Sequence, residues 1–191
     1  MVTISVIVPT IGRDSLISCL NSLKNQTFDD FEIVVVGTNK KSKTIAEMFS
    51  HVRFVFSPIW NNAYQKNLGV NCSRGDIVAF IDDDAVAEPN WLEELVKHFK
   101  KKQVACVGGR IKIKPQGPLP TFLRKIHPNM ARGFLGGSLL HYEKSVELKE
   151  AMLWGSNISF KKTVLKKLGG FDLRLEGQSI TWSLKKKGKS K

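Results

Sequence analysis

The chain has 191 residues, 42% of them hydrophobic, which suits one folded domain of ordinary size with a substantial core. It carries 30 Lys and Arg against 17 Asp and Glu, and a net charge of +13 favours anionic partners such as phosphorylated substrates, nucleic acid or an anionic membrane surface. The three cysteines are widely spaced, which excludes a disulfide scaffold and a regular zinc-ligand pattern, and no apolar run is long enough to span a bilayer.

The apolar run at residues 2–8 lacks a basic flank and a small-residue cleavage site, so we predict a strand there and not a signal peptide. Strand and helix patterns then alternate, as is typical of a parallel sheet with helical crossovers. The predicted strands cover residues 4–8, 31–36, 52–56, 76–81 and 104–113. The predicted helices cover residues 16–23, 62–72 and 92–99, with a further short helix near residue 44. Two pairs with capping-box spacing mark helix starts: Thr44 with Glu47, and Asn90 with Glu93.

The regular alternation ends after residue 113. Several prolines and glycines make residues 115–141 irregular, and long segments of this kind often serve as functional loops or lids. Further on we predict a strand at 152–160, a basic helix that ends at Leu168, a turn at 169–172 and a last helix after Gly177.

The predicted strand at residues 76–81 leads directly into Asp82, Asp83 and Asp84. Parallel sheets bind ligands at the carboxyl ends of their strands, and three adjacent carboxylates need an offsetting charge there. A Mg²⁺ or Mn²⁺ ion shared with a substrate diphosphate meets that need. The alternative is that the aspartates cap the next helix, although that helix has its own start signal downstream.

Several segments together resemble family 2 glycosyltransferases in type and order. They are Val8-Pro9-Thr10, Ser22-Leu23-Lys24-Asn25-Gln26-Thr27, Phe31-Glu32-Ile33-Val34-Val35-Val36, Lys66-Asn67-Leu68-Gly69, Asp82-Asp83-Asp84 and Gly169-Gly170-Phe171-Asp172. The resemblance covers nearly the whole chain. It implies an α/β GT-A (Rossmann-like) fold, a mostly parallel sheet flanked by helices with an irregular acceptor-side segment. Residues 1–113 are then the nucleotide-sugar-binding half, and residues 114–191 are the acceptor-side half of the same domain, ending in a basic tail.

The resemblance also implies the activity. A hexosyltransferase-like enzyme of this family moves a sugar from a nucleotide-sugar donor to a glycan or lipid-linked acceptor, usually with inversion, and uses Mn²⁺ or Mg²⁺. At the family's DXD motif, Asp82 and Asp83 are expected to contact the nucleotide, and Asp84, with Asp82, the metal. Other implied nucleotide-binding residues are Pro9, Thr10, Gly37, Asn39 and Lys66.

The alternatives for these residues are structural. Pro9 and Thr10 can be a strand terminator and a turn residue, and Lys66 can be a solvated helix lysine. Gly155, Ser156 and Asn157 match the segment that lines the sugar site in the family, and a turn at the start of a strand is their alternative.

The family usually places a Glu-Asp pair, which supplies the general base, after the Gly-Gly-Phe-Asp turn. Gln178 and Ser179 stand there in this chain, and Glu176 is the nearest carboxylate and hence the candidate catalytic base. A second hypothesis is therefore an impaired relative that binds a nucleotide sugar or glycan without turnover. A nucleotidyltransferase is a third possibility, but no glycine-rich phosphate loop follows the first strand.

The partners expected from this interpretation are a nucleotide-sugar donor, UDP- or another NDP-sugar, and a glycan or lipid-linked acceptor. The few, widely spaced cysteines indicate reduced thiols in a cytoplasmic protein, and the positive charge favours peripheral contact with an anionic membrane at its inner face. No RNA-binding motif or DNA-reading helix is present, and no nucleic-acid partner is expected.

Overall fold

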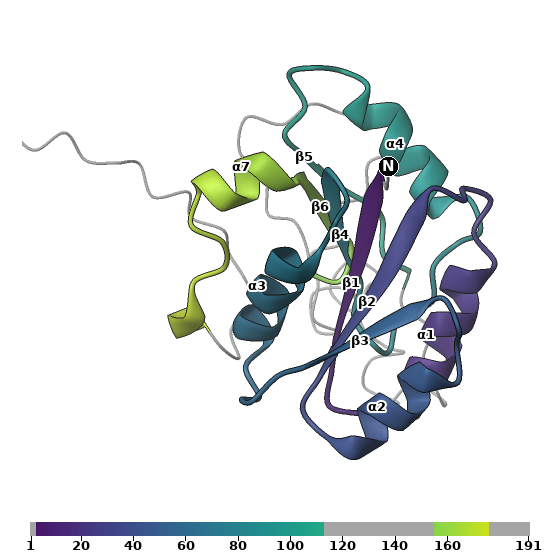
Figure 1. The fold of residues 1–191 in the computed structure, drawn as a ribbon. Coiled ribbons are helices and arrows are strands. Elements are labelled where there is room, and N and C mark those ends of the chain that lie inside the picture. The colour runs from purple at the N-terminus through teal and green to yellow at the C-terminus, as the bar shows by residue number, and fades with distance from the viewer. Residues whose placement is uncertain (1–2, 113–154, 176–191) are drawn as a thin grey trace, which may run out of the picture. The chain divides into compact units, whose positions relative to one another are not determined.

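The computed structural model of the chain describes residues 3–112 and 155–175. Within these ranges a six-stranded sheet has the order β3-β2-β1-β4-β6-β5 and helices flank it (Figure 1). The strands are β1 (Ile4–Thr10), β2 (Phe31–Gly37), β3 (Val52–Phe56), β4 (Ile77–Phe80), β5 (Cys106–Gly108) and β6 (Ile158–Lys161). The helices are α1 (Ser15–Lys24), α2 (Lys40–Glu47), α3 (Asn62–Cys72), α4 (Trp91–Phe99), α7 (Lys162–Lys167) and the 3₁₀ turn η1 (Leu173–Leu175). The chain divides into two compact units, residues 1–108 with 152–191 and residues 109–151, and all these elements belong to the first unit.

The sheet is mostly parallel, as predicted. Strand β1 pairs in parallel with β2 on one side and with β4 on the other, and β2 pairs in parallel with β3. Only β6 runs antiparallel to its neighbours β4 and β5 among the strands that the structure describes. The carboxyl ends of β1, β2 and β4 therefore meet at one edge of the sheet, and the register places Thr10 beside Gly37 there.

Both faces of the sheet are covered, which explains why its central strands are continuously apolar. Successive side chains of β1 alternate between two cores. Ile4, Val6 and Val8 pack with residues of α1, α2 and α4, while Ile7 packs with residues of α3 and α7. All seven residues of β1 are buried.

Two predicted capping boxes are wrong. Helix α2 begins at Lys40 because Asn39 is its N-cap: Asn39 accepts a hydrogen bond from the Ser42 amide, and the Ser42 side chain completes the box. Thr44, the predicted start, lies inside the helix. At α4, Asn90 precedes the helix but has φ −96° and ψ 13°, not the extended conformation of a capping residue, and its side chain makes no cap hydrogen bond.

The strand predicted at 104–113 is shorter than its apolar pattern suggested. Only residues 106–108 pair with β6, and the described residues that follow, 109–112, form no strand. A strand persists only where a neighbour supplies hydrogen-bonding partners, which an apolar pattern does not reveal.

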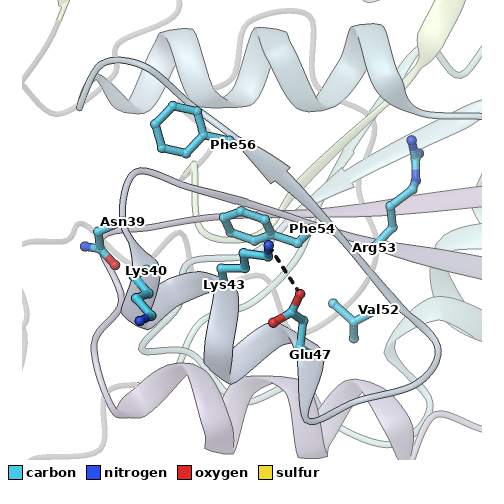
Figure 2. A pocket seen from close by; sticks show the side chains of 8 residues that line it. All are labelled: Asn39, Lys40, Lys43, Glu47, Val52, Arg53, Phe54 and Phe56. Atoms are coloured by element: carbon cyan, nitrogen blue, oxygen red, sulfur yellow. Dashed lines mark ion pairs between the residues drawn. The ribbon is translucent and has the colours of Figure 1, made fainter.

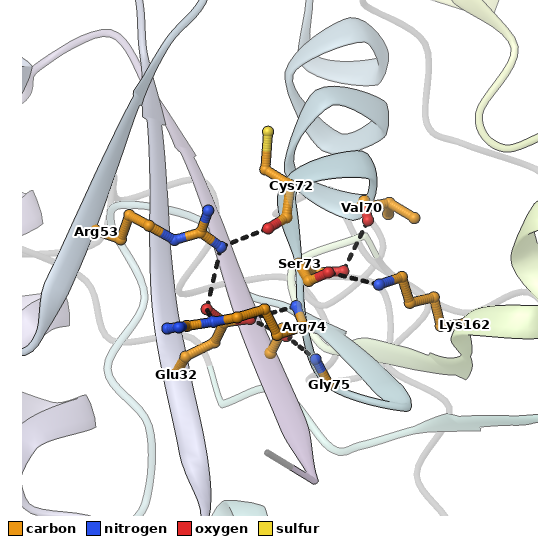
Figure 3. Close-up of polar contacts among 9 residues, drawn as sticks. Glu32, Arg53, Val70, Cys72, Ser73, Arg74, Gly75 and Lys162 are labelled. Carbon is orange, nitrogen blue, oxygen red and sulfur yellow. Dashed lines mark hydrogen bonds and ion pairs between the residues drawn. The ribbon is translucent and has the colours of Figure 1, made fainter. Parts of the chain in front are cut away.

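Glu32 is a buried carboxylate near the amino-terminal end of β2, far along the strand from the edge that carries the aspartates (Figure 3). Its oxygens accept a 2.6 Å hydrogen bond from the Ser5 hydroxyl and lie 3.0 Å from Arg53 Nη2 and 3.1 Å from Arg74 Nε. Burial by itself raises the pKa of Glu32, but the hydrogen bonds from Ser5 and Arg74 and the charge of Arg53 outweigh it and hold the pKa below its usual value. This cluster joins β1, β2, β3 and the turn before β4.

None of the helices in the described ranges is long and apolar enough to cross a membrane.

Candidate functional site

The three aspartates lie where the sequence predicted, directly after β4 at the carboxyl edge of the sheet. Because β1 is the parallel neighbour of β4, the end of β1 delivers Thr10 to the same place. The edge therefore gathers polar side chains from segments more than seventy residues apart, as ligand sites of parallel α/β sheets do.

Asp83 is buried, and both of its carboxylate oxygens have partners. Oδ2 accepts a 2.5 Å hydrogen bond from the Thr10 hydroxyl, and Oδ1 lies 3.5 Å from Nη1 of Arg13. Burial raises the pKa of Asp83, while the Thr10 hydrogen bond and the Arg13 charge oppose part of that rise. Asp83 is thus held firmly between the two strand ends.

Asp84 is the exposed member of the triplet, with 58% of its side chain accessible. Its Oδ2 accepts a hydrogen bond from Arg13 Nη1 at 3.3 Å. Sequence reasoning missed Arg13. The sequence did contain a signal for it. Arg13 lies three residues after Thr10, and the loop that follows β1 passes the end of the neighbouring strand β4, where the aspartates lie.

Asp82 faces a buried cation. Its Oδ1 lies 4.0 Å from Nζ of Lys66 in α3, and the Lys66 side chain is almost wholly buried, at 2% exposure. Burial lowers the pKa of Lys66, and Asp82 opposes part of that shift; burial likewise raises the pKa of Asp82 against the effect of Lys66. The alternative of a solvated helix lysine is therefore wrong for Lys66.

The Lys66 ammonium also contacts groups on the other side. It donates a 3.3 Å hydrogen bond to the carbonyl oxygen of Gly155 and lies 6.0 Å and 5.7 Å from the ring centroids of Phe80 and Phe171. Lys66 therefore joins the aspartate turn to the segment that precedes β6.

The base of the aspartate turn is packed against α1. The Cys19 thiol lies 3.6 Å from the carbonyl oxygen of Asp82, and burial, with the three aspartates, raises the pKa of Cys19 to about 12. Cys19 is thus an unreactive thiol under the site.

The end of β2 lies next to this site but is occupied by structural contacts. A Cβ on Gly37 would come within 2.3 Å of Ser42 Oγ, so glycine is required there for α2 to pack. The Asn39 side chain caps α2 with its oxygen and donates from Nδ2 to the carbonyl of Ile11 at 2.6 Å. Both residues were expected to bind nucleotide, and both already have a structural task at this edge.

Gln65 is a second residue that sequence reasoning missed. It is buried, and its Nε2 donates to the carbonyl oxygens of Thr10 at 2.9 Å and Val36 at 2.7 Å. Gln65 thereby fixes the spacing of the β1 and β2 ends. A glutamine within a helix gives no sequence signal for such a role. Pro9 is buried and stands opposite Val36 in the sheet register.

The expected sugar-site residues lie in the turn before β6. Gly155 and Ser156 are half-buried, and Gly155 contacts Lys66 as described. Asn157 accepts a 3.0 Å hydrogen bond from the indole N–H of Trp91 in α4. Glu176, Gln178 and Ser179 lie outside the described residues.

A depression lies between α2 and β3, and Figure 2 shows the side chains that line it. Its lining is partly aromatic and partly charged and includes a Lys43–Glu47 ion pair of 3.6 Å. The lining residues are Asn39, Lys40, Lys43, Glu47, Val52, Arg53, Phe54 and Phe56. Only Asn39 is shared with the expected site residues, so this depression does not coincide with the aspartates.

No cluster of three or more His, Cys, Asp or Glu side chains in the described ranges could hold a metal ion by itself. The aspartates nonetheless fit a divalent cation that is bound together with phosphate. Mg²⁺ usually takes one or two carboxylates and completes its shell with water and substrate phosphate oxygens. The exposed Asp84 and the partly exposed Asp82 suit that role, whereas both oxygens of Asp83 have partners in the protein.

Solved structures share this fold. Residues 1–349 of S. aureus TarS superpose with a TM-score of 0.69 at 18% identity, covering 93% of this chain and 52% of that fragment. The mannosyltransferase PcManGT from Pyrobaculum calidifontis, in complex with GDP-Man and Mn²⁺, superposes with a TM-score of 0.67 at 22% identity, covering 89% of this chain and 47% of PcManGT. The fold is accordingly the GT-A fold of glycosyltransferases.

The family follows from the sequence match. The profile described as "Glycosyl transferase family 2" matches residues 5–169, so the chain belongs to glycosyltransferase family 2. Among curated relatives, the glucosyl-dolichyl phosphate glucuronosyltransferase of Haloferax volcanii is 29% identical over 179 residues, covering 88% of this chain and 56% of the relative. The chain spans about half the length of these relatives.

Proposed function

We propose that the chain is a metal-dependent glycosyltransferase that moves a sugar from a nucleotide-sugar donor to a glycan or lipid-linked acceptor, with inversion at the anomeric carbon. The observation that carries the proposal is the meeting of Thr10, Lys66 and the aspartates at one edge of the sheet in a chain of family 2. PcManGT, which shares the fold, was solved with GDP-Man and Mn²⁺, and this supports a nucleotide-sugar donor and a divalent cation here.

The residues divide into roles by exposure. Asp83, locked to Thr10, faces the nucleoside, and Pro9, Gly37 and Asn39 shape the pocket around it. Asp84, with Asp82, holds the Mn²⁺ or Mg²⁺ ion. The ion, when bound, offsets the negative charge that develops on the departing nucleoside diphosphate.

Lys66 supplies a fixed positive charge on the inner side of the site. Its burial between Phe80 and Phe171 keeps water away, so its attraction for a phosphate oxygen is strong. The backbone of Gly155 and the side chains of Ser156 and Asn157 lie on the expected sugar side, and Glu176 is the proposed base for the acceptor hydroxyl. The Gly155–Lys66 contact supports a sugar site next to the diphosphate.

The proposed acceptor rests on a curated relative, and the proposed location rests on the net charge of the chain. The Haloferax relative is named for a dolichyl phosphate substrate, which supports a lipid-linked acceptor. The net charge of +13 supports peripheral binding to the anionic inner face of a membrane from the cytoplasm. Salt-sensitive co-sedimentation with anionic liposomes is the expected result, and a failure to bind them at low salt would contradict this part of the proposal.

The alternative is a relative that binds a nucleotide sugar without turnover, because Gln178 and Ser179 replace the usual Glu-Asp pair. A donor-hydrolysis and transfer assay with Mn²⁺ separates the two. The enzyme proposal expects product that disappears in Asp84→Ala and persists in Asp14→Ala, a change in an exposed aspartate of the β1–α1 loop. Donor binding without any product from the wild type would favour the alternative.

A further inference from the structure

Arg13 bridges two of the three aspartates with a single nitrogen. Its Nη1 lies 3.5 Å from Oδ1 of Asp83 and 3.3 Å from Oδ2 of Asp84. A guanidinium is always charged at physiological pH and has five N–H donors, of which this contact uses few. Arg13 therefore offsets part of the negative charge at the point where the proposed cation binds.

The backbone around Arg13 is fixed by hydrogen bonds and close packing, while its side chain is about half exposed and contacts the two carboxylates. Gly12 adopts φ 83°, and its amide donates to Thr10 Oγ1 at 2.9 Å. Asn39 donates to the Ile11 carbonyl at 2.6 Å, and a Cβ on Gly12 would meet the Asn39 Oδ1 at 2.8 Å. These contacts fix the loop, yet 54% of the Arg13 side chain is exposed. The guanidinium can therefore leave the carboxylates without unfolding the loop.

A divalent cation and the Arg13 guanidinium compete for Asp84. Two positive groups cannot share one carboxylate oxygen at contact distance without strong repulsion. A cation bound at Asp84 would repel the Arg13 guanidinium on Oδ2, and this repulsion, together with the loss of the ion pair, lowers the affinity of the site for the cation alone. A diphosphate offers the released guanidinium a better partner, since guanidinium and phosphate form bidentate, charge-assisted hydrogen bonds.

We infer that Arg13 is a displaceable counter-ion that couples the two ligands: it holds cation affinity low until a nucleoside diphosphate gives its guanidinium a new partner. This inference rests on the proposed function, because it concerns the same aspartates. The inference adds Arg13 as a ligand-binding residue. It also makes cation binding depend on the nucleotide, because the cation binds well only when the nucleotide is bound too.

The test is the affinity of the full chain for Mn²⁺, measured from the free-Mn²⁺ signal in electron paramagnetic resonance, without nucleotide and then with UDP or GDP. The variants are Arg13→Gln, which removes the charge, and Arg13→Lys, which keeps it. Lys41→Gln is the matched control, because Lys41 pairs with the neighbouring Asp14 at 2.7 Å and not with the triplet. Thermal unfolding confirms that each variant is folded.

Without nucleotide, Arg13→Gln is expected to bind Mn²⁺ at least about fivefold more tightly than the wild type, at the lower end of usual coupling between two ligands. The factor by which nucleotide strengthens Mn²⁺ binding is expected to shrink in Arg13→Gln. Lys41→Gln should match the wild type, and Arg13→Lys should lie closer to the wild type than Arg13→Gln does.

Two other outcomes are distinguishable. If Mn²⁺ binds and Asp84→Ala abolishes it, but Arg13→Gln behaves like Lys41→Gln, the inference is overturned and the proposed function stands. If neither the wild type nor Arg13→Gln binds Mn²⁺, with UDP or GDP or without them, the metal-dependent function and the inference both fail.

Discussion

The Thr10 hydroxyl donates a 2.5 Å hydrogen bond to Oδ2 of Asp83, although 73 positions separate the two residues in the chain. The contact joins the end of β1 to the turn after β4 and presents Asp83 in a fixed orientation. It depends on the parallel pairing of the two strands, in which Ile7 stands opposite Phe80. The site is therefore a product of the sheet topology.

Replacing Thr10 tests this contact. Thr10→Val keeps the side-chain shape and removes the donor, so the buried Asp83 loses a partner. We expect a loss of ~1–2 kcal/mol in the free energy of unfolding, measured by urea denaturation. We also expect about tenfold weaker nucleotide binding by calorimetry, because Asp83 is no longer held.

Thr27→Val is the matched control, since the Thr27 hydroxyl bonds the exposed Glu93 at 3.1 Å. It should change the free energy of unfolding by less than ~0.5 kcal/mol and leave nucleotide affinity unchanged. Equal effects of the two variants would show that the Thr10–Asp83 bond has no special role.

The charge of Lys66 is expected to lower the stability of the fold and to strengthen nucleotide binding. Because burial lowers its pKa from 10.5, the folded state gives up the proton more readily than the unfolded state, and the charged amine costs stability at neutral pH. Lys66→Met removes that cost. We expect an unfolding free energy no lower than that of the wild type at pH 7, and nucleoside diphosphate affinity at least about tenfold weaker.

The pH dependence provides a second check on Lys66. The wild type should gain stability relative to Lys66→Met as pH rises toward 10.5, since deprotonation relieves the buried charge. Lys24→Met, at an exposed position in the last turn of α1, is the control and should show neither change. Unaltered nucleotide affinity in Lys66→Met would contradict the assigned role.

Glu32 should control part of the acid stability of the fold. Its pKa is lowered in the folded state, so its contribution to stability is fully present above the ordinary value of 4.5 and is lost as pH falls through the lower folded pKa. Glu32→Gln keeps the shape and removes the charge beside Arg53 and Arg74. We expect a loss of ~1–3 kcal/mol at pH 7 that shrinks as the solution becomes more acidic.

Glu47→Gln, which removes one partner of an exposed helix pair with Lys43, is the control and should cost less than ~0.5 kcal/mol. Denaturant unfolding from pH 7 to pH 3 is the measurement. A constant difference between Glu32→Gln and the wild type across this range would contradict the assigned pKa direction.

Asn67 should hold the Gly-Gly-Phe-Asp turn against α3. Its Oδ1 accepts from the Phe171 amide at 2.8 Å and its Nδ2 donates to the Phe171 carbonyl at 2.9 Å. Asn67→Ala breaks both bonds and should cost ~2–3 kcal/mol in the free energy of unfolding. Asn67→Asp keeps the acceptor and loses the donor, so its cost should be smaller. Equal costs would show that the hydrogen bond from the Phe171 amide to Oδ1 does not contribute to stability.

Most strands of the sheet could be predicted because the signals for each strand lie within the strand itself. Continuous apolar runs at β1 and β4 indicate that both strands are buried, and Asp82 follows shortly after β4. Pro9, expected to end the first strand, lies within β1, which continues to Thr10. Helix α3 was predicted with its observed bounds, Asn62–Cys72. The start of α2 was missed because two nearby pairs, Asn39 with Ser42 and Thr44 with Glu47, both have capping-box spacing. Asn39 is the cap in the structure, where it also donates to the Ile11 carbonyl in a neighbouring loop.

The site could be predicted only in part, for a related reason. Three adjacent aspartates after a buried strand are evident in the sequence, but the residues that contact them come close only in the folded chain. Gln65 acts through residues brought close by the sheet, and nothing in its own segment indicates this, whereas the position of Arg13 just after β1 was a usable signal. Lys66 was expected to bind nucleotide, with a solvated helix lysine as the alternative, and the sequence did not reveal that its side chain would be buried near Phe80 and Phe171.

The most direct test of the central claim is calorimetric titration of UDP, GDP, CDP and ADP into the full chain, with and without Mn²⁺. We expect one nucleotide to bind at least about tenfold more tightly with Mn²⁺, Asp84→Ala to abolish this gain and Asp14→Ala to keep it. Binding of no nucleotide, or an affinity that Mn²⁺ and Asp84→Ala leave unchanged, would contradict the claim.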